Sequence, residues 1–176
     1  PVYGGRVPDV AAKRLKNIKG DNTPAIIVVV YGNRDYDDAL IELRDLVCQQ
    51  GFNPIAGAAF IGEHSFSTED SSIAKGRPDE NDMKVARKLG EKVQKLIGEK
   101  RFNRNLEVPG KCPYKEKGNM PKVSPLTDES ACEPCEICKS VCPTGAIKID
   151  GVAIADSSTC ILCCACIKEC PNNARY

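Results

Sequence analysis

No stretch of this 176-residue chain approaches the roughly 20 consecutive apolar residues that a transmembrane helix needs. A signal sequence is not visible either, and the chain shows neither a nucleic-acid motif nor a glycine-rich run with the spacing of a phosphate-binding loop. These absences exclude a membrane-spanning protein and argue against one that binds nucleic acid. We therefore expect a soluble, cytoplasmic protein whose partners are neither membranes nor nucleic acids.

Histidine is nearly missing as well, since His64 is the only one. It follows the end of a predicted strand, and open α/β sheets bind their ligands near such ends. A single histidine in a loop is nevertheless more often incidental. We assign no catalytic residue from the sequence.

Neither sign of charge dominates the whole chain, which has a formal net charge of +1. Residues 127–176, however, hold seven acidic and four basic residues, a net charge of −3. The other 126 residues hold 21 basic and 17 acidic residues, a net charge of +4. An acidic end of this kind suits docking to basic partner proteins, through association rate and orientation more than through affinity.

Cysteine, in contrast, is abundant, and eight of the 11 cysteines form two copies of one pattern. Each copy reads C-x2-C-x2-C-x3-C-P, and every cysteine recurs after 28 residues. The copies are Cys132, Cys135, Cys138, Cys142 with Pro143, and Cys160, Cys163, Cys166, Cys170 with Pro171. A cubane iron–sulfur cluster has an iron atom at four of its corners. Three closely spaced thiolates can bind three of these iron atoms from one loop, and a residue from elsewhere must bind the fourth. The prolines lack an N–H and turn the chain away from helix.

Several other interpretations of these cysteines compete. A disulfide framework is disfavoured, because dense cysteines in a chain of intracellular type more often bind metal. Structural zinc is the stronger rival, since C-x2-C pairs also build sites of four cysteines. Zinc sites usually pair two such hairpins across a longer gap, and three cysteines in one run would crowd a single tetrahedron. A cluster with three iron atoms is a further alternative.

Over residues 127–176 the chain resembles the bacterial 2[4Fe–4S] ferredoxins, in which the fourth cysteine of each run ligates the other cluster. The resemblance implies two [4Fe–4S] clusters and electron transfer between redox partner proteins. It also implies the ligands of each cluster. They would be Cys132, Cys135, Cys138 and Cys170 for one cluster, and Cys160, Cys163, Cys166 and Cys142 for the other.

Three cysteines lie outside the pattern, and we expect none of them to be a ligand. Cys164 stands next to Cys163 and is expected to point away from the cluster. Cys48 lies on the apolar face of a predicted helix, where a free cysteine acts as a small hydrophobe. Cys112 precedes a proline but has no partner run nearby.

A small β-hairpin is predicted between the two runs. The apolar alternation of 146–149 and 152–154 surrounds the turn residues Asp150 and Gly151. A domain this small has little core of its own, so cluster ligation should supply much of its folding energy.

The first hundred residues have a different pattern, that of an open α/β sheet. The run 25–31 is continuously apolar, as in a buried parallel strand, and 32–33 form a turn. Gly51 is a plausible C-cap for the helix that follows. The expected elements are helices over 10–18, 37–47 and 79–100 and strands over 25–31 and 53–61.

Two loops in this part resemble the loops of flavodoxin-like proteins that flank the flavin ring. Residues 1–8 (PVYGGRVP) are similar to the loop after the third strand, and residues 31–39 (YGNRDYDDA) to the loop after the fourth. The resemblance implies possible FMN ring contacts at Tyr3, Gly4, Tyr31, Gly32 and Asn33. The plainer alternative is that the tyrosines are half-buried rim residues.

The chain departs from that family in one respect. A flavodoxin opens with a strand and a loop that cradles the FMN phosphate, and nothing here has that character. Either the chain is a fragment of a longer protein, which we favour, or the domain has lost FMN. A partial sheet would leave an edge and an apolar face uncovered, which invites self-association.

These patterns predict a partial flavodoxin-like α/β domain over 1–100, an irregular linker over 101–126, and a small α+β ferredoxin domain over 127–176. The leading hypothesis is an electron carrier rather than an enzyme. The second is part of an oxidoreductase in which FMN, bound by a longer parent protein, feeds electrons to the clusters. The third is a zinc-held structural module.

Overall fold

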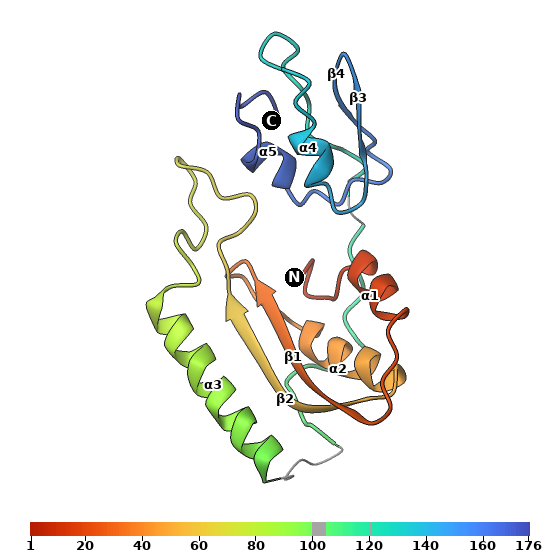
Figure 1. Ribbon diagram of the computed structural model, residues 1–176, viewed down its shortest axis with the longest axis vertical. Coiled ribbons are helices and arrows are strands. Elements are labelled where there is room, and N and C mark those ends of the chain that lie inside the picture. The colour runs from red at the N-terminus through yellow and green to blue at the C-terminus, as the bar shows by residue number, and fades with distance from the viewer. Residues whose placement is uncertain (100–104, 120) are drawn as a thin grey trace. The chain divides into compact units, whose positions relative to one another are not determined.

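The computed structural model describes residues 1–99, 105–119 and 121–176. The chain divides into two compact units, Pro1–Gly118 and Asn119–Tyr176, which Figure 1 colours red to green and blue-green to blue. Lys100, at the end of the last predicted helix, and 101–104 and 120 of the predicted linker lie outside the described residues.

The first unit alternates helix and strand. Its elements are α1 (Asp9–Leu15), β1 (Thr23–Tyr31), α2 (Ala39–Gln49), β2 (Phe52–Ile61) and α3 (Glu80–Gly98). β1 and β2 pair in parallel, from Thr23 beside Phe52 to Tyr31 beside Ile61. The predicted order of elements and the parallel pairing are confirmed, and the predicted boundaries differ by a few residues at most.

The inner face of the strand pair packs on α2 (Figure 1). Ile27 and Val29 of β1 form a buried cluster with Ala39, Leu40 and Val47 of α2. After α2 the chain reverses at Gly51, whose φ of 84° is unfavourable for residues with a side chain. Its N–H donates to the carbonyl of Cys48 over 2.9 Å. Gly51 therefore ends the helix as the sequence predicted.

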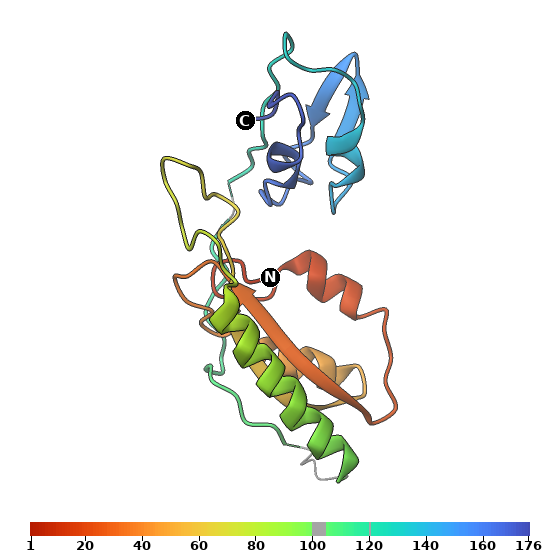
Figure 2. The same ribbon diagram turned by 60° about the vertical axis from the view of Figure 1, so that its left-hand side comes forward.

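The other face of β1 is open. α3 lies on the side of the strand pair opposite α2 (Figure 1, Figure 2), and its buried Val93 packs on Ile55 and Ala56 of β2. Ile26, Val28 and Val30 of β1 are 43 to 49% exposed. The predicted buried strand is therefore buried on one face only, because helix packing covers every second residue of β1. The open face is the uncovered apolar face that we expected of a partial sheet.

α3 begins with a capping box. The carboxylate of Asp79 accepts the N–H groups of Asn81 and Asp82, and the carboxylate of Asp82 accepts the N–H of Asp79 over 2.8 Å. Arg77 binds the same Asp82 carboxylate through two nitrogens. The bonds of the capping box satisfy backbone N–H groups at the start of α3, which have no acceptor within the helix. The apolar stripe predicted for α3 is only partly buried, since Met83, Val85 and Ile97 are exposed.

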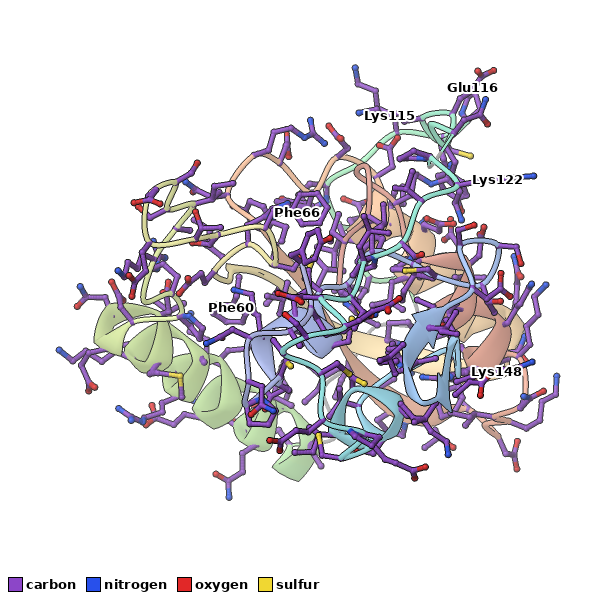
Figure 3. All side chains as sticks on the ribbon, turned by 90° about the horizontal axis from the view of Figure 1, so that it is seen from above. Phe60, Phe66, Lys115, Glu116, Lys122 and Lys148 are labelled. Carbon is purple, nitrogen blue, oxygen red and sulfur yellow. The ribbon has the colours of Figure 1, made fainter. Side chains whose placement is uncertain are left out.

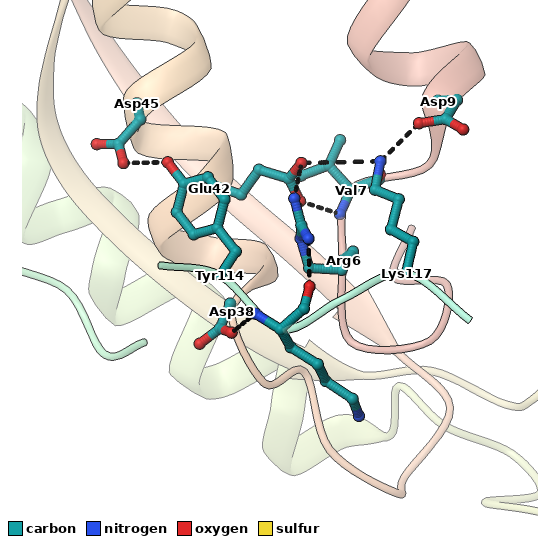
Figure 4. Close-up of polar contacts among 9 residues, drawn as sticks. Arg6, Val7, Asp9, Asp38, Glu42, Asp45, Tyr114 and Lys117 are labelled. Carbon is teal, nitrogen blue, oxygen red and sulfur yellow. Dashed lines mark hydrogen bonds and ion pairs between the residues drawn. The ribbon is translucent and has the colours of Figure 1, made fainter. Parts of the chain in front are cut away.

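Residues 105–118, which we predicted to be part of a linker, are irregular in backbone but belong to the first unit, where they pack beside α2. The carboxylate of Asp38, just before α2, accepts the backbone N–H groups of Lys111 at 2.8 Å and Lys115 at 2.7 Å. These bonds lower the pKa of Asp38. The Tyr114 hydroxyl donates to Asp45 (Figure 4), and burial together with that bond raises the pKa of Tyr114.

A buried ion pair lies beneath this segment. Glu42 of α2 accepts the Nε and Nη2 of Arg6, each over 2.8 Å, and the N–H of Val7 over 2.7 Å. Lys117 Nζ is 3.8 Å from the same carboxylate and 2.6 Å from Asp9 (Figure 4). The pair therefore fixes the 1–8 loop to α2.

The second unit contains the predicted hairpin. β3 (Ile147–Asp150) and β4 (Val152–Ala155) pair antiparallel around Gly151, whose φ is 70°. Two single-turn helices, α4 (Ile137–Ser140) and α5 (Ala165–Lys168), complete the unit. Its core is small and includes two cysteines: Cys138, Ile147, Ala153 and Cys166 form the buried cluster. Among the described residues, no helix of either unit has the length and apolarity to cross a membrane.

Candidate metal centre

The two cysteine runs adopt matching backbone conformations. Glu136 precedes α4 and Cys164 precedes α5, 28 residues later, and both are left-handed, with φ of 62° and 58°. Each short helix then carries the third cysteine of its run, Cys138 or Cys166, both buried. The repeat in sequence is therefore also a repeat in structure.

The two copies are joined reciprocally. The N–H of Asp128, at the start of the first copy, donates to the carbonyl of Ala174, at the end of the second. The N–H of Asp156 donates to the carbonyl of Ala146 in the same way, and both distances are 2.8 Å. The start of each copy thus pairs with the end of the other.

Four cysteines line one cavity, which we call the first cysteine cavity. Cys132, Cys135 and Cys138 of the first run line it, and the fourth cysteine is Cys170 of the second run. The remaining wall comes mainly from Pro171, Ala174, Ala153 and Arg175. The cavity thus gathers one of the two sets that the sequence predicted.

The second cysteine cavity gathers the other set. Cys160, Cys163 and Cys166 line it together with Cys142 of the first run. Its wall is largely apolar, with Ile147 and Ile161 among its members. Cys164 lines this cavity too, although we expected its side chain to point away; its thiol lies 3.7 Å from the carbonyl of Leu162.

Backbone N–H groups point at several of these sulfur atoms. Ala146 donates to Cys142 Sγ over 3.2 Å, and the equivalent Ala174 donates to Cys170 Sγ over 3.3 Å. Leu162 donates to Cys160 Sγ over 3.4 Å. Donors of this kind stabilise negative charge on sulfur, as a thiolate ligand requires.

Burial and hydrogen bonding act in opposite directions on the thiols. Burial raises the pKa of Cys138 and of Cys166, and Arg175 opposes it at both. Burial also acts on Cys142, but hydrogen bonds, foremost from Thr144, outweigh it and lower the pKa of that thiol. Cys142 is therefore the thiol among these three that ionises most readily.

Arg175 was missed in the sequence. Its side chain lines the first cysteine cavity, and its Nη2 lies 3.9 Å from Cys166 Sγ of the second. The sequence does contain a signal for it. When the two cysteine copies are aligned by their 28-residue offset, Arg175 falls at the position that Ile147 has in the first copy.

The candidate flavin contacts lie at the carboxyl end of β1. Val2 donates to the carbonyl of Val30 over 3.0 Å, which brings the loop with Tyr3 and Gly4 next to Tyr31. Asn33 is left-handed, with φ of 66°. A Cβ on Gly32 would lie 2.2 Å from the His64 ring, so His64 packs directly on that glycine. His64 also makes an edge contact with Phe66, whose side chain is exposed.

The donor chemistry of the two cavities fits a [4Fe–4S] cluster in each. Each is lined by the first three cysteines of one run and the fourth of the other, with a backbone N–H donor to the sulfur of that fourth cysteine, and the second cavity is also lined by Cys164. Among the described residues no three His, Cys, Asp or Glu side chains gather around a single ion position. The fit therefore rests on the thiols, their cavities and the N–H donors.

One curated protein is similar to this chain over 68 residues, with 37% identity. It is the pyruvate synthase subunit PorD of Methanocaldococcus jannaschii. The match covers 79% of that protein and 38% of this chain. No protein-family model matches the chain, and no solved structure does either.

Proposed function

This chain belongs to the same family as pyruvate synthase subunit PorD, and we propose that it transfers electrons through two [4Fe–4S] clusters. The observation that carries the proposal is the composition of the two cysteine cavities. Each is lined by three cysteines of one run and the fourth of the other. A random collapse of cysteines would not sort them reciprocally.

The residues proposed as ligands are Cys132, Cys135, Cys138 and Cys170 in the first cavity and Cys160, Cys163, Cys166 and Cys142 in the second. A bound [4Fe–4S] cluster supplies one-electron transfer at a potential set by charge, hydrogen bonds to sulfur and exposure. The chain contributes the N–H donors of Ala146 and Ala174 and the largely apolar wall of the second cavity. It leaves Cys135 at the surface, where a partner can approach.

We propose that partner subunits receive or deliver these electrons, since the relative is by its name a subunit of a larger enzyme. The acidic balance of residues 127–176 favours a basic docking surface on the partner. Electron transfer should therefore slow as ionic strength rises, because salt screens the attraction.

A second candidate is a flavin-linked oxidoreductase. It is favoured by the backbone bond between Val2 and Val30, which brings the two flavodoxin-like loops together. In this proposal the ring of FMN would lie against Tyr3, Gly4, Tyr31, Gly32 and Asn33, and a longer protein would supply the phosphate site.

Metal and sulfide analysis of the purified protein, kept under anaerobic conditions, tests the leading proposal. We expect a brown protein with about eight iron and about eight acid-labile sulfide per chain. A colourless protein with about two zinc ions and no sulfide would establish the zinc-held module instead. Flavin released on denaturation would favour the second candidate.

A further inference from the structure

Arg175 is a buried cation next to both cysteine cavities. Only 3% of the residue is exposed. Its side chain lines the first cavity, and its Nη2 lies 3.9 Å from the Cys166 sulfur in the second. Cys166 and the first-cavity cysteine Cys138 belong to one buried cluster. Arg175 therefore contacts a thiol of the second cavity and forms part of the wall of the first.

Its partners within the protein are neutral. Nη1 donates to the Thr127 hydroxyl and, over 3.1 Å, to the carbonyl of Ala153. Nε is buried and has no hydrogen-bond partner. Within the described part of the chain no carboxylate forms an ion pair with Arg175. A buried charge without a counter-charge and an orphan donor are both costly, so the site needs a nearby anion.

The internal repeat shows that the arginine is not required for packing alone. The equivalent position in the first copy is Ile147, which is 5% exposed and packs in the core. Both residues sit in equivalent backbone pairs, Thr127 with Arg175 and Ala155 with Ile147. An apolar side chain therefore suits this backbone position, and the second copy has a cation there instead.

We propose that Arg175 is a positioning residue shared by the two [4Fe–4S] sites, holding positive charge and hydrogen-bond donors against the thiolate sulfurs of both. This inference rests on the proposed function. A cation beside a cluster favours the reduced form, which carries one more negative charge, and hydrogen bonds to sulfur act in the same direction. Arg175 therefore raises the reduction potentials of both clusters and provides the counter-charge that the buried thiolates need.

The experiment compares three variants in the loaded protein. Arg175→Met removes the charge and the donors but keeps an unbranched apolar stem. Arg175→Lys keeps the charge and loses the planar fork. Lys148→Met is the control, because Lys148 is an exposed cation on β3 (Figure 3) whose charge water screens. Iron and sulfide contents are measured first, and the potentials then follow from redox titrations monitored by electron paramagnetic resonance.

We expect Arg175→Met to lower both potentials. At the wild-type midpoint the ratio of reduced to oxidised cluster should fall about tenfold, which for one electron is about 59 mV. Arg175→Lys should recover part of that shift, and Lys148→Met should have potentials close to wild type. Wild-type potentials in an iron-replete Arg175→Met protein, or an equal shift in Lys148→Met, would overturn the proposal.

Two further outcomes are also decisive. If Arg175→Met does not retain iron, the Arg175→Lys variant is the test: full clusters whose potentials lie at or moderately below those of the wild type support the role of the charge. Loss of iron in that variant too would mean that the guanidinium only holds Thr127 and Ala153 together, and the inference would fail. Absence of iron from the wild-type protein would instead remove the proposed function itself.

Discussion

Asp128 donates its backbone N–H to the carbonyl oxygen of Ala174 over 2.8 Å, joining the start of the first cysteine copy to the end of the second. Asp156 donates its backbone N–H to the carbonyl oxygen of Ala146 in the same way, which joins the start of the second copy to the end of the first. These bonds hold the fourth cysteine of each copy, four residues before the alanine, beside the three cysteines of the other. The exchange of fourth cysteines is thus a consequence of backbone pairing.

The exchange makes the effect of Cys170→Ala predictable. Loss of the Cys170 thiol should expose the three cysteines of the first cavity, Cys132, Cys135 and Cys138, although Cys170 is closer in sequence to the other run. We expect iron to fall to about half, and mass spectrometry after alkylation to show these three thiols modified. Alkylation of Cys160, Cys163 and Cys166 instead would contradict the assignment.

Cys164→Ala is the matched control, because Cys164 also lines a cavity but lies outside the repeated pattern. Its iron content should equal that of the wild type, as should that of Cys48→Ala. Cys142→Ala should have the corresponding effect on the second cavity, exposing the thiols of Cys160, Cys163 and Cys166.

The buried pair of Arg6 and Glu42 allows a prediction on stability. Their side chains are 12% and 9% exposed, and Glu42→Gln would leave the guanidinium without its counter-charge. Breaking such a pair costs about 3 kcal/mol. Urea unfolding followed by circular dichroism should show this loss, whereas Glu80→Gln, in the exposed pair with Arg87, should change stability by less than about 1 kcal/mol. Equal effects of the two variants would contradict the importance of burial.

Much of the first unit was predictable, because its strands and helices follow local patterns. The apolar run 25–31 predicted β1, and Gly51 predicted the end of α2. An uncovered apolar face was expected of a partial sheet, but its identity as the face of Ile26, Val28 and Val30 was not predictable, since that depends on which helix covers which face. The packing of 105–118 was missed for a similar reason: Asp38 binds backbone amides more than 70 residues away, and amides leave no signal in a sequence.

The cysteine sets were predictable only through resemblance, because spacing alone leaves the fourth ligand open. The cavities add what the sequence does not contain, namely which walls surround the thiols. Arg175 shows the limit most clearly. The 28-residue repeat aligns this arginine with Ile147, but the sequence does not show that its side chain is buried and that its Nε has no hydrogen-bond partner.

Asp82 gives a prediction on pH. The ion pair with Arg77, aided by the N–H of Asp79, lowers the pKa of Asp82 from 3.8 to about 2. A lowered pKa in the folded state stabilises the protein above the unfolded value, and this contribution disappears as pH falls through the folded value. The melting temperature of the wild type should therefore exceed that of Asp82→Asn at pH 5, and the difference should shrink between pH 3.8 and about 2. A difference independent of pH would show that capping geometry, not charge, accounts for the effect.

The last prediction concerns FMN. Its phosphate carries most of its charge and is normally held by a rigid loop of backbone N–H donors. This chain offers only candidate ring contacts, and His64 packs on Gly32, one of them. Ring contacts alone should bind weakly, because they must offset the entropy of association without the charged group.

We therefore expect the purified chain to release no flavin on denaturation, and a fluorescence titration with FMN to show no tight binding. Riboflavin, which has the ring but no phosphate, is the matched ligand. It should bind about as weakly as FMN, because no site for the phosphate distinguishes them. Stoichiometric FMN, or a strong preference for FMN over riboflavin, would reveal a phosphate site built from residues that neither flavodoxin-like loop contains.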